Sequence, residues 1–349
     1  MNKPAFPYHQ RLTLQNFTAF SEASLEFVPG LNVLIGENGT GKTHIMKAMY
    51  AWRLARHLAE PNRDAKYEQV FTETYAAASV AELQRRKQKG AIASGRFGEN
   101  DWKVALQNRS AVDNGIRPEP PRPAFIPAIE MMSHARNMNG ILRDYADFDR
   151  TCFDFIAMLT AQQASDRPDA ALEGISVLKS LIPGEVEWNE PEQRFYLVEK
   201  GKRLPFSLVA EGLRKVSSLY RLAQSGWLRP GGVLFWDEPE VNLNPKWMDE
   251  IVEALIALAR GGVQIILATH SYVILKEIDL NLRNQNGRAE AAVPARYFSL
   301  NRERGSSRVM WADDFASLNP NSILDQYDQM LVEDWHLQDR ANGREKSEK

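Results

Sequence analysis

The stretch GENGTGKTH, residues 36–44, constrains the fold of this chain more than any other feature. It contains Gly36 and Gly41, followed directly by Lys42 and Thr43, which is the spacing of a phosphate-binding loop. Glycines at these positions let successive backbone N–H groups point at phosphate oxygens. The apolar run LNVLI precedes the loop, and a segment with apolar residues at helical spacing follows it. This order of strand, glycine loop and helix predicts a nucleotide-binding α/β fold.

Each residue of the loop is a candidate nucleotide contact. Lys42 can reach the β- and γ-phosphates, and the hydroxyl of Thr43 can bind Mg²⁺. The predicted nucleotide-binding residues are Gly36, Glu37, Asn38, Gly39, Thr40, Gly41, Lys42, Thr43 and His44.

A second element, VLFWDEPE over residues 233–240, has four large apolar residues followed by two acids. This pattern predicts a buried strand that delivers carboxylates to its C-terminal edge, where open parallel sheets bind their ligands. We expect Asp237 to hold the Mg²⁺ together with Thr43, and Glu238 to polarise the attacking water. Phosphoryl transfer needs this division because its catalysis is mostly positioning and charge stabilisation.

A third element, IILATHS, places His270 directly after another apolar run. We therefore expect His270 to reach the same sheet edge, where a histidine can hydrogen-bond a γ-phosphate or the attacking water. A lone histidine after a strand is more often structural, so this expectation depends on the other two elements.

The remaining sequence predicts a mixed α/β architecture. Alternation of polar and apolar residues over 10–20 and 22–28 predicts two antiparallel, half-exposed strands. We expect a helix over 43–60, helical structure over 62–90, a hairpin over 96–108, an extended connector over 117–123 and a strand over 124–130. Helices with a polar break at 165–169 are expected over 135–183, and a hairpin over 184–203. A helix from Ser207, a helix from Pro245 and alternating strands follow. A hairpin across 301–306 and an acidic helix precede a charged tail, 341–349, predicted to be disordered.

Composition excludes several classes of protein. Hydrophobic content of 44% and charged content of 25% are typical of soluble globular chains, and no run is long enough to span a membrane. The N-terminus has no apolar signal segment. The single cysteine, Cys152, is expected to be a buried apolar residue and excludes an internal disulfide. We therefore expect a cytoplasmic protein. The net charge of −2 gives no general attraction to nucleic acid, so DNA contacts would need local patches such as 85–89 or 200–203.

Together, the three elements resemble those of ABC-type ATPases, specifically the soluble branch that contains SMC proteins, RecF and the OLD-like ATPases. The opening residues 12–43 are similar to the N-terminus of that branch, and DEPEVNLNP resembles its Walker B motif and D-loop. ATHS matches its switch histidine, and FIPAIEMMS, residues 125–133, resembles the Q-loop region of small OLD-like ATPases. The resemblance implies an ABC-ATPase head with an antiparallel N-terminal β subdomain and a helical insert lobe.

The resemblance also implies a homodimer or higher homo-oligomer. Two heads would face each other head to tail and bury two ATP molecules, each touching the phosphate loop of one copy and a signature helix of the other. VAEGLRK, residues 209–215, lies where the family has Leu-Ser-Gly-Gly-Gln. Ala210 replaces the family serine and Glu211 its first glycine, whereas Gly212 remains and Ser207 is a substitute hydroxyl. An amphipathic core helix is the alternative interpretation of this segment.

Two other family positions differ in this chain. Asn242 and Asn244 fall in the D-loop, with Asn244 at the position of the family aspartate. Asn244 is also a good N-cap for a helix that begins at Pro245. No glutamine occupies the Q-loop position, for which Glu130 is the nearest polar candidate.

These matches predict four segments. Residues 1–134 form the N-terminal half of the head, 135–206 the insert lobe, 207–312 the C-terminal half, and 313–349 a C-terminal helix and tail. No sustained heptad pattern lies between Thr43 and Ser207, so we expect no long coiled-coil arm. The roughly 50 residues after 295–300 are too few for a nuclease domain, and Asp313 and Asp314 are expected in a turn or helix cap.

The leading hypothesis is an Mg²⁺-dependent ATPase that acts as a dimerising switch on a partner effector, with bacterial anti-phage defence as the setting that the resemblance implies. The alternative is a RecF-like ATPase that binds duplex DNA in repair or recombination. A third interpretation is a protein that binds ATP without hydrolysing it. No membrane partner is expected.

Overall fold

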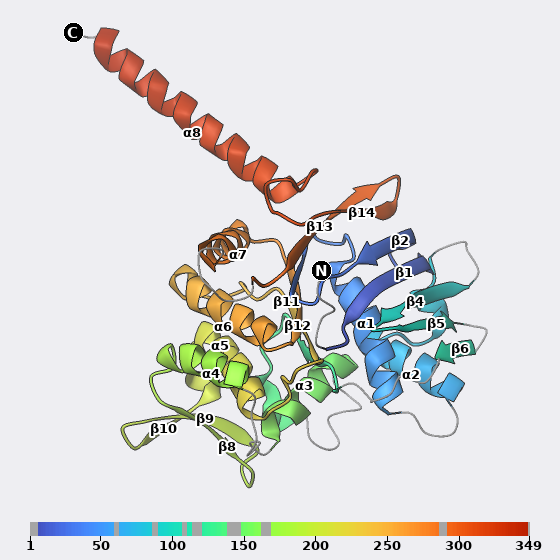
Figure 1. Ribbon diagram of the computed structural model, residues 1–349. Coiled ribbons are helices and arrows are strands. Elements are labelled where there is room, and N and C mark those ends of the chain that lie inside the picture. Colours follow the sequence, from blue (N-terminus) through green and yellow to red (C-terminus); the bar gives the residue numbers. More distant parts are fainter. Residues whose placement is uncertain are drawn as a thin grey trace.

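A computed structural model of the chain describes residues 6–58, 63–85, 90–106, 110–113, 121–137, 148–161, 169–285 and 292–347. Its centre is a six-stranded sheet with the order β14-β13-β3-β12-β11-β7 (Figure 1). The strands are β3 (Leu31–Gly36), β7 (Ala124–Ile126), β11 (Val233–Asp237), β12 (Gln264–Thr269), β13 (Ala295–Glu303) and β14 (Ser306–Ala312). Every neighbouring pair is parallel except β13 and β14. This arrangement confirms the predicted P-loop α/β fold.

The central strands β3, β11 and β12 are buried throughout and mostly apolar because both of their faces are covered. Leu31, Val33 and Ile35 of β3 join a core shared with α5 (Glu211–Gln224) and α6 (Met248–Arg260). Leu34, which points to the opposite face, joins a second core formed with α1 (Lys42–His57) and the antiparallel sheet. The period-two alternation of a strand therefore divides the two cores at β3.

The N-terminal subdomain is an antiparallel sheet with the order β2-β1-β4-β5-β6. Its strands are β1 (His9–Phe17), β2 (Phe20–Glu26), β4 (Ala91–Phe97), β5 (Asn100–Leu106) and β6 (Ser110–Asp113). The predicted pair of half-exposed strands and the hairpin over 96–108 are confirmed for the described residues.

Helical structure over 62–90 was too long a prediction. The helix α2 (Arg63–Tyr75) ends before Ala76, which has a left-handed φ of 50°, and only the short 3₁₀ helix η1 (Val80–Leu83) follows. The chain then pairs with the end of β1, since the N–H of Thr18 donates to the Leu83 carbonyl at 2.9 Å. Tertiary pairing with the β1–β2 turn thus outweighs the polar helical pattern. Residues 86–89 of the basic patch lie outside the described residues.

The insert lobe contains helices and a small sheet, as predicted. It comprises η2 (Met132–Asn137), α3 (Arg150–Thr160), α4 (Asp169–Ser180), β8 (Glu185–Asn189), β9 (Arg194–Glu199), β10 (Lys202–Pro205) and η4 (Phe206–Leu208). Cys152 is buried in α3, and burial raises the pKa of its thiol to about 12, which confirms the expected apolar role. The predicted break over 165–168 and the connector residues 117–120 lie outside the described residues.

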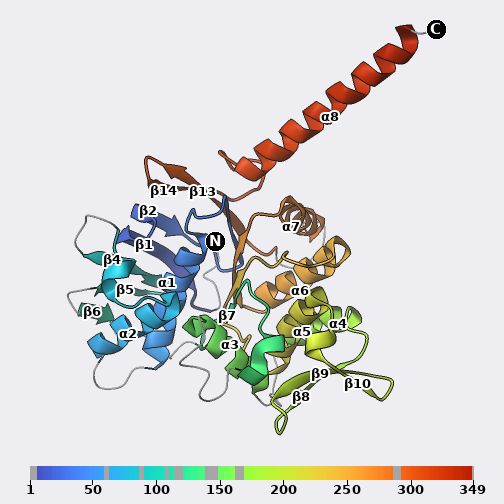
Figure 2. The same cartoon turned by 180° about the vertical axis from the view of Figure 1, so that it is seen from behind.

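The C-terminal part contains η5 (Pro245–Trp247), α7 (Tyr272–Gln285) and α8 (Ser322–Ser347). Figures 1 and 2 show α8 projecting away from the body of the molecule. The expectation of a disordered tail over 341–349 is wrong as far as Ser347, because Ala, Arg, Glu and Lys favour continuation of the helix. Asp314 accepts a hydrogen bond from the Ser317 N–H at 2.8 Å, which confirms the predicted turn. Among the described helices, none combines the length and apolar character needed to cross a bilayer.

His9 is a buried histidine with a consequence for stability. Its ring is fully buried against Trp52, Phe97 and Phe235, and neither ring nitrogen has a hydrogen-bond partner among the described residues. Burial, and next the charge of Arg53, hold the pKa of His9 well below 6.5. Below about pH 6.5, His9 binds a proton in the unfolded chain but stays neutral in the folded chain. The folded state therefore loses stability relative to the unfolded state as the pH falls.

We expect this one group to cost about 1.4 kcal/mol of unfolding free energy between about pH 7.5 and about pH 5.5. His9→Phe fills the same apolar site without a titrating nitrogen, so its loss over this range should be smaller by that amount. Urea unfolding of both proteins at the two pH values measures the difference. Equal losses in the two proteins would show that His9 is not the source.

Candidate active site

The phosphate loop follows β3 directly and requires its two outer glycines. A Cβ atom at Gly36 would lie 2.3 Å from the Leu300 carbonyl oxygen, and one at Gly41 would lie 2.7 Å from the ring of Phe20. Gly41 also has a φ of 95°, which disfavours any residue with a side chain. Neighbouring strands thus leave no room for a side chain at Gly36 and Gly41, and only the backbone of the loop fits there.

The side chains of Lys42 and Thr43 lie over the loop as the motif predicts. The Lys42 ammonium donates to the carbonyl oxygens of Gly36 at 2.6 Å and Glu37 at 3.0 Å. Burial lowers the pKa of Lys42, whereas Glu238, Asp237 and Glu240 raise it. The Thr43 hydroxyl donates to Asp237 Oδ2 at 2.8 Å, so the two predicted Mg²⁺ ligands are neighbours.

The other loop residues present their backbone and not their side chains. The Thr40 hydroxyl donates to the Glu37 carbonyl oxygen at 2.8 Å and closes the loop on itself. Glu37, Asn38 and Gly39 are exposed on its outer side. Contacts of these residues with a nucleotide remain predictions.

Asp237 ends β11 in a mostly buried position. Burial, opposed by the hydrogen bond from Thr43, raises the pKa of its carboxyl to about 6. A desolvated carboxylate beside a hydroxyl is an oxygen-rich site with excess negative charge, which is the chemistry that Mg²⁺ prefers. The donor set of Thr43 and Asp237 therefore fits that cation.

Glu238 follows in a left-handed backbone conformation with a φ of 49°. Its N–H donates to the Ala268 carbonyl oxygen at 2.8 Å, and its own carbonyl oxygen accepts from Lys215 Nζ at 3.2 Å. Strained backbone of this kind persists only where surrounding contacts enforce it. Lys215, on the face of α5 that packs against this loop, was not identified from the sequence, where it looked like one more charge on an amphipathic helix.

His270 reaches the same edge from the end of β12. Its Nδ1 lies 3.6 Å from Glu238 Oε1 and also 3.6 Å from Glu240 Oε1. The structure therefore brings Asp237, Glu238 and His270 together. Glu240 was also missed, although it is the third acid of the DEPE motif.

A hollow of about 550 Å³ lies beside the phosphate loop. Residues from the β1–β2 turn, from α1 and from the segment after α2 line it, including Gly39, Thr18, Tyr75 and Arg85. His44, the last residue of the predicted set, also lines it, with its ring 5.5 Å from that of Tyr75. Burial lowers the pKa of His44 to about 4, so its ring is neutral at physiological pH. The volume is sufficient for a nucleoside.

The predicted signature helix begins later than expected. Ser207 lies exposed in the 3₁₀ helix η4, and α5 begins at Glu211 because Ala210 is extended, with a φ of −56° and a ψ of 139°. A Cβ atom at Gly212 would lie 2.6 Å from the carbonyl oxygen of Asn242. Gly212 thus lets the signature helix pack directly on the D-loop of its own chain.

The D-loop turns through Asn242, which has a φ of 60°. Asn244 Oδ1 then accepts from the Lys246 N–H at 3.1 Å, which confirms Asn244 as the cap of the helix that begins at Pro245.

Glu130 follows β7 and is buried. Its carboxylate accepts from the Met132 N–H at 2.5 Å and the Ser133 hydroxyl at 2.7 Å, and forms an ion pair with Arg214 of α5 at 2.9 Å. A hollow of about 410 Å³ is lined by Glu130, Arg214 and Glu238 among others. Glu130 therefore connects the Q-loop region to the signature helix, whereas its role toward the nucleotide remains a prediction.

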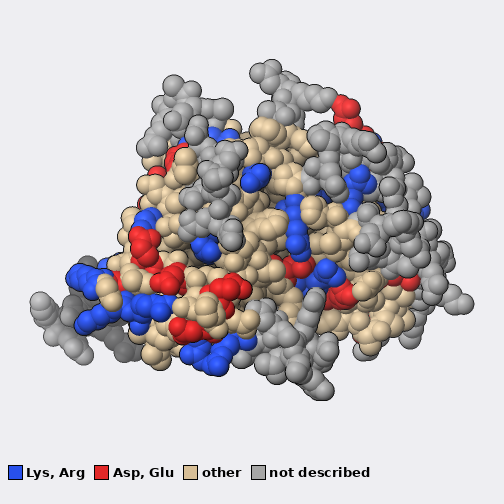
Figure 3. All heavy atoms as spheres, turned by 90° about the horizontal axis from the view of Figure 1, so that it is seen from below, with Lys and Arg blue, Asp and Glu red and all other residues tan. Residues whose placement is uncertain are grey.

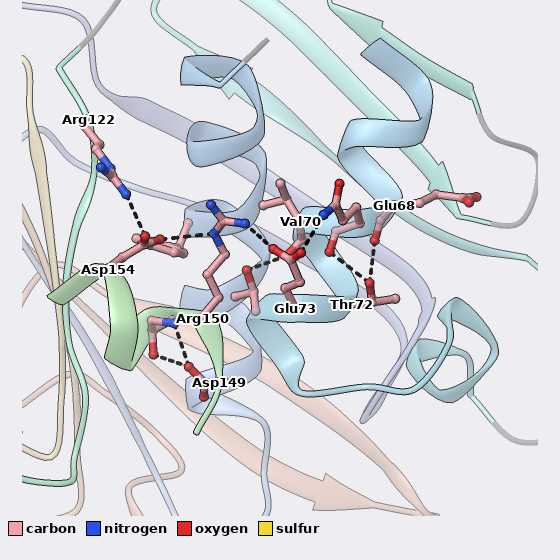
Figure 4. A network of polar contacts seen from close by, with 12 residues as sticks. Glu68, Val70, Thr72, Glu73, Arg122, Asp149, Arg150 and Asp154 are labelled. Carbon is pink, nitrogen blue, oxygen red and sulfur yellow. Dashed lines mark hydrogen bonds and ion pairs between the residues drawn. The ribbon is translucent and has the colours of Figure 1, made fainter. Parts of the chain in front are cut away.

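A mostly buried polar network connects α1 and α2 to the insert lobe, and Figure 4 shows its Glu73, Arg122, Arg150 and Asp154 side chains. Asp154 of α3 accepts from the Tyr50 hydroxyl of α1 at 2.7 Å and pairs with Arg122 at 2.7 Å and Arg150 at 3.3 Å. Arg150 also pairs with Glu73 of α2. Movement of the phosphate-loop helix relative to α3 would break the hydrogen bond between Tyr50 and Asp154 in a poorly solvated place.

The surface charges are interleaved. Figure 3 shows Lys and Arg side chains alternating with Asp and Glu on the face seen from below. In the predicted basic patch at 200–203, Arg203 pairs with Glu187 at 2.9 Å and Lys200 with Glu199 at 4.0 Å. These lysine and arginine side chains are therefore matched by acids within the same small sheet.

Comparisons with known proteins concern the family and the fold of this chain. Residues 83–276, more than half of the chain, match the family model "AAA domain, putative AbiEii toxin, Type IV TA system", and residues 11–92 match a second AAA domain model. The DNA replication and repair protein RecF of Streptococcus suis is 41% identical over 56 residues, which are 16% of this chain and 15% of that protein. RecF of Halalkalibacterium halodurans is 45% identical over 47 residues, 14% of this chain and 13% of that protein. The chain thus spans less than a fifth of these relatives.

Solved structures with a similar fold are SMC heads. The Smc head domain of Pyrococcus furiosus with an extended coiled coil, bound to the C-terminal domain of ScpA, has a TM-score of 0.55 at 12% identity and covers 94% of this chain and 99% of that one. A second SMC head, bound to the winged-helix domain of ScpA, has a TM-score of 0.51 at 11% identity, with 89% and 99% covered. These similarities concern the fold.

Proposed function

Because the chain belongs to this AAA family and has the fold of an SMC/RecF-like ABC-type P-loop ATPase, we propose that it hydrolyses ATP and uses it to close two copies of itself. One observation carries the proposal. Asp237, Glu238 and His270, from two neighbouring strands, meet at the sheet edge where the hydroxyl of Thr43 already contacts Asp237.

Each residue has a defined task in this proposal. The loop N–H groups and Lys42 bind the phosphates, and the base enters the hollow lined by Thr18 and His44. Thr43 and Asp237 hold Mg²⁺, which neutralises charge on the phosphates. Glu238 accepts a hydrogen bond from the attacking water and orients it toward the γ-phosphate, and His270 donates to that phosphate.

The second copy supplies the other half of the site. The first backbone N–H groups of α5 have no partner within the helix, and Ala210 provides no side-chain cap for them. We propose that this end, with Gly212, Glu211 and Ser207, faces the γ-phosphate held by the other copy. Its direct packing on Asn242 would let the D-loop move with it.

We further propose that closure regulates a separate effector protein in the cytoplasm of a bacterium during anti-phage defence. The description of the matched family, which mentions a toxin system, supports this setting. In the part of the chain that the structure describes, no group of three or more metal-ligating side chains forms a separate site.

A RecF-like role in DNA repair is the second candidate, favoured by the sequence match to RecF. It requires affinity for duplex DNA that falls steeply with salt and rises with ATP. Fluorescence anisotropy with a labelled duplex, with and without ATP, tests it. Assembly in ATP without duplex affinity would exclude the RecF-like role and retain the switch.

Hydrolysis is expected to require a divalent cation. Phosphate release from purified protein with ATP and Mg²⁺ should stop when EDTA is added and recover when excess Mg²⁺ is restored, because Thr43 and Asp237 supply only oxygen ligands. Asp237→Asn should remain slow at every Mg²⁺ concentration. Turnover that is unaffected by EDTA would contradict this assignment.

A further inference from the structure

Glu240 is a buried carboxylate without a task in the scheme above. Its side chain is 8% exposed, and it lies in the loop that connects β11 to the D-loop. Burial of a charged group is costly unless other groups engage it. Its contacts therefore indicate what it does.

Among the described residues, the hydrogen bonds of its side chain go to the end of the neighbouring strand. Glu240 Oε1 accepts from the Thr269 hydroxyl at 2.7 Å and from the His270 N–H at 3.0 Å, and His270 Nδ1 lies 3.6 Å away. The second oxygen, Oε2, is buried and has no hydrogen-bond partner among the described residues. A single oxygen thus accepts the backbone N–H of the histidine and lies near its ring.

The backbone of Glu240 is itself held in place. The Leu243 N–H donates to the Glu240 carbonyl oxygen at 3.1 Å, and the Val241 N–H donates to that of Glu238 at 3.3 Å. Glu238 and Glu240 are therefore parts of one hydrogen-bonded turn. Both carboxylates face His270 at the same distance of 3.6 Å from Nδ1.

We propose that Glu240 is a positioning residue that sets His270 relative to the catalytic carboxylate of Glu238. Its side chain accepts from the Thr269 hydroxyl and the His270 N–H, and it acts on the chemical step through the histidine. Without its oxygen, the Thr269 hydroxyl and the His270 N–H lose their hydrogen-bond acceptor on the turn that carries Glu238. The inference rests on the proposed ATP hydrolysis.

A purely structural role is the competing explanation, since Glu240 also satisfies a backbone N–H next to α7. A structural role would lower stability and would act whether or not His270 is present. A positioning role acts on the chemical step and disappears when His270 is absent. A double-mutant cycle separates the two.

Glu240→Ala is expected to lower kcat for ATP about tenfold or more, with KM changed by less than about twofold, because small misplacements of catalytic groups carry large costs. In a His270→Ala background, Glu240→Ala should have no further effect on kcat. Glu240→Gln retains an oxygen at Oε1, so its kcat should stay within about threefold of wild type. Glu253→Ala, which removes an exposed carboxylate from α6, is the matched control.

Two results would overturn the proposal: an equal loss from Glu240→Ala with and without His270, or a Glu240→Gln variant as slow as Glu240→Ala. If the wild type shows no turnover, the proposed hydrolysis fails and the inference is tested by hydrogen exchange. The His270 amide should then exchange at least about tenfold faster in Glu240→Ala than in wild type or Glu240→Gln. Unchanged exchange would contradict the contact itself.

Discussion

Lys42→Ala is expected to abolish measurable ATP binding. The substitution removes an ammonium that now bridges the Gly36 and Glu37 carbonyl oxygens and that would turn to the phosphates in the complex. Charge-assisted hydrogen bonds contribute about 1.5–3 kcal/mol each, so the loss of two predicts a decrease in affinity of about 100-fold or more. Equilibrium titration with a fluorescent ATP analogue in Mg²⁺ measures it.

Lys103→Ala provides the control for Lys42→Ala, since Lys103 is an exposed lysine of β5 remote from the loop. Its affinity should equal that of wild type. Both variants should retain the wild-type circular dichroism spectrum. Retained affinity in a folded Lys42→Ala protein would place the nucleotide elsewhere.

Glu238→Gln is expected to bind ATP normally and to hydrolyse it at least about 100-fold more slowly than wild type. A general base contributes about 10²–10⁴-fold, and glutamine keeps the size and hydrogen bonding of the side chain without the basic oxygen. Single-turnover phosphate release measures the rate. A variant that turns over at the wild-type rate would favour a protein that binds ATP without hydrolysing it through this residue.

Short-range patterns predicted the parts of the site that lie within single elements. The loop at residues 36–43, the acids at the end of β11 and the histidine at the end of β12 each follow a buried strand, and parallel pairing brings them together. The sheet order was not predicted, but strand ends in a parallel sheet share an edge whatever the order. For this reason the convergence of Asp237, Glu238 and His270 could be expected without it.

Residues whose task depends on tertiary contacts were missed. Lys215 and Glu240 look like ordinary surface charges in the sequence, and only the packing of α5 and β12 around one turn gives them partners. The close approach of Gly212 to the Asn242 carbonyl was missed in the same way, because it joins two segments that are distant in the sequence. The sequence patterns predicted too long a helical segment at α2 and too early an end of α8. Pairing with β1 ends helical structure after Tyr75, whereas helix-forming residues continue it to Ser347.

The proposed function requires that ATP close two copies of the chain over shared sites. Size-exclusion chromatography with light scattering, applied to Glu238→Gln with Mg²⁺ in the presence and absence of ATP, tests it most directly. Without ATP, we expect the mass of one chain or of a loose oligomer. With ATP, we expect a long-lived assembly of at least two copies. This assembly should be absent in the Lys42→Ala, Glu238→Gln double variant. An identical mass with and without ATP would contradict ATP-driven closure of two copies of the chain.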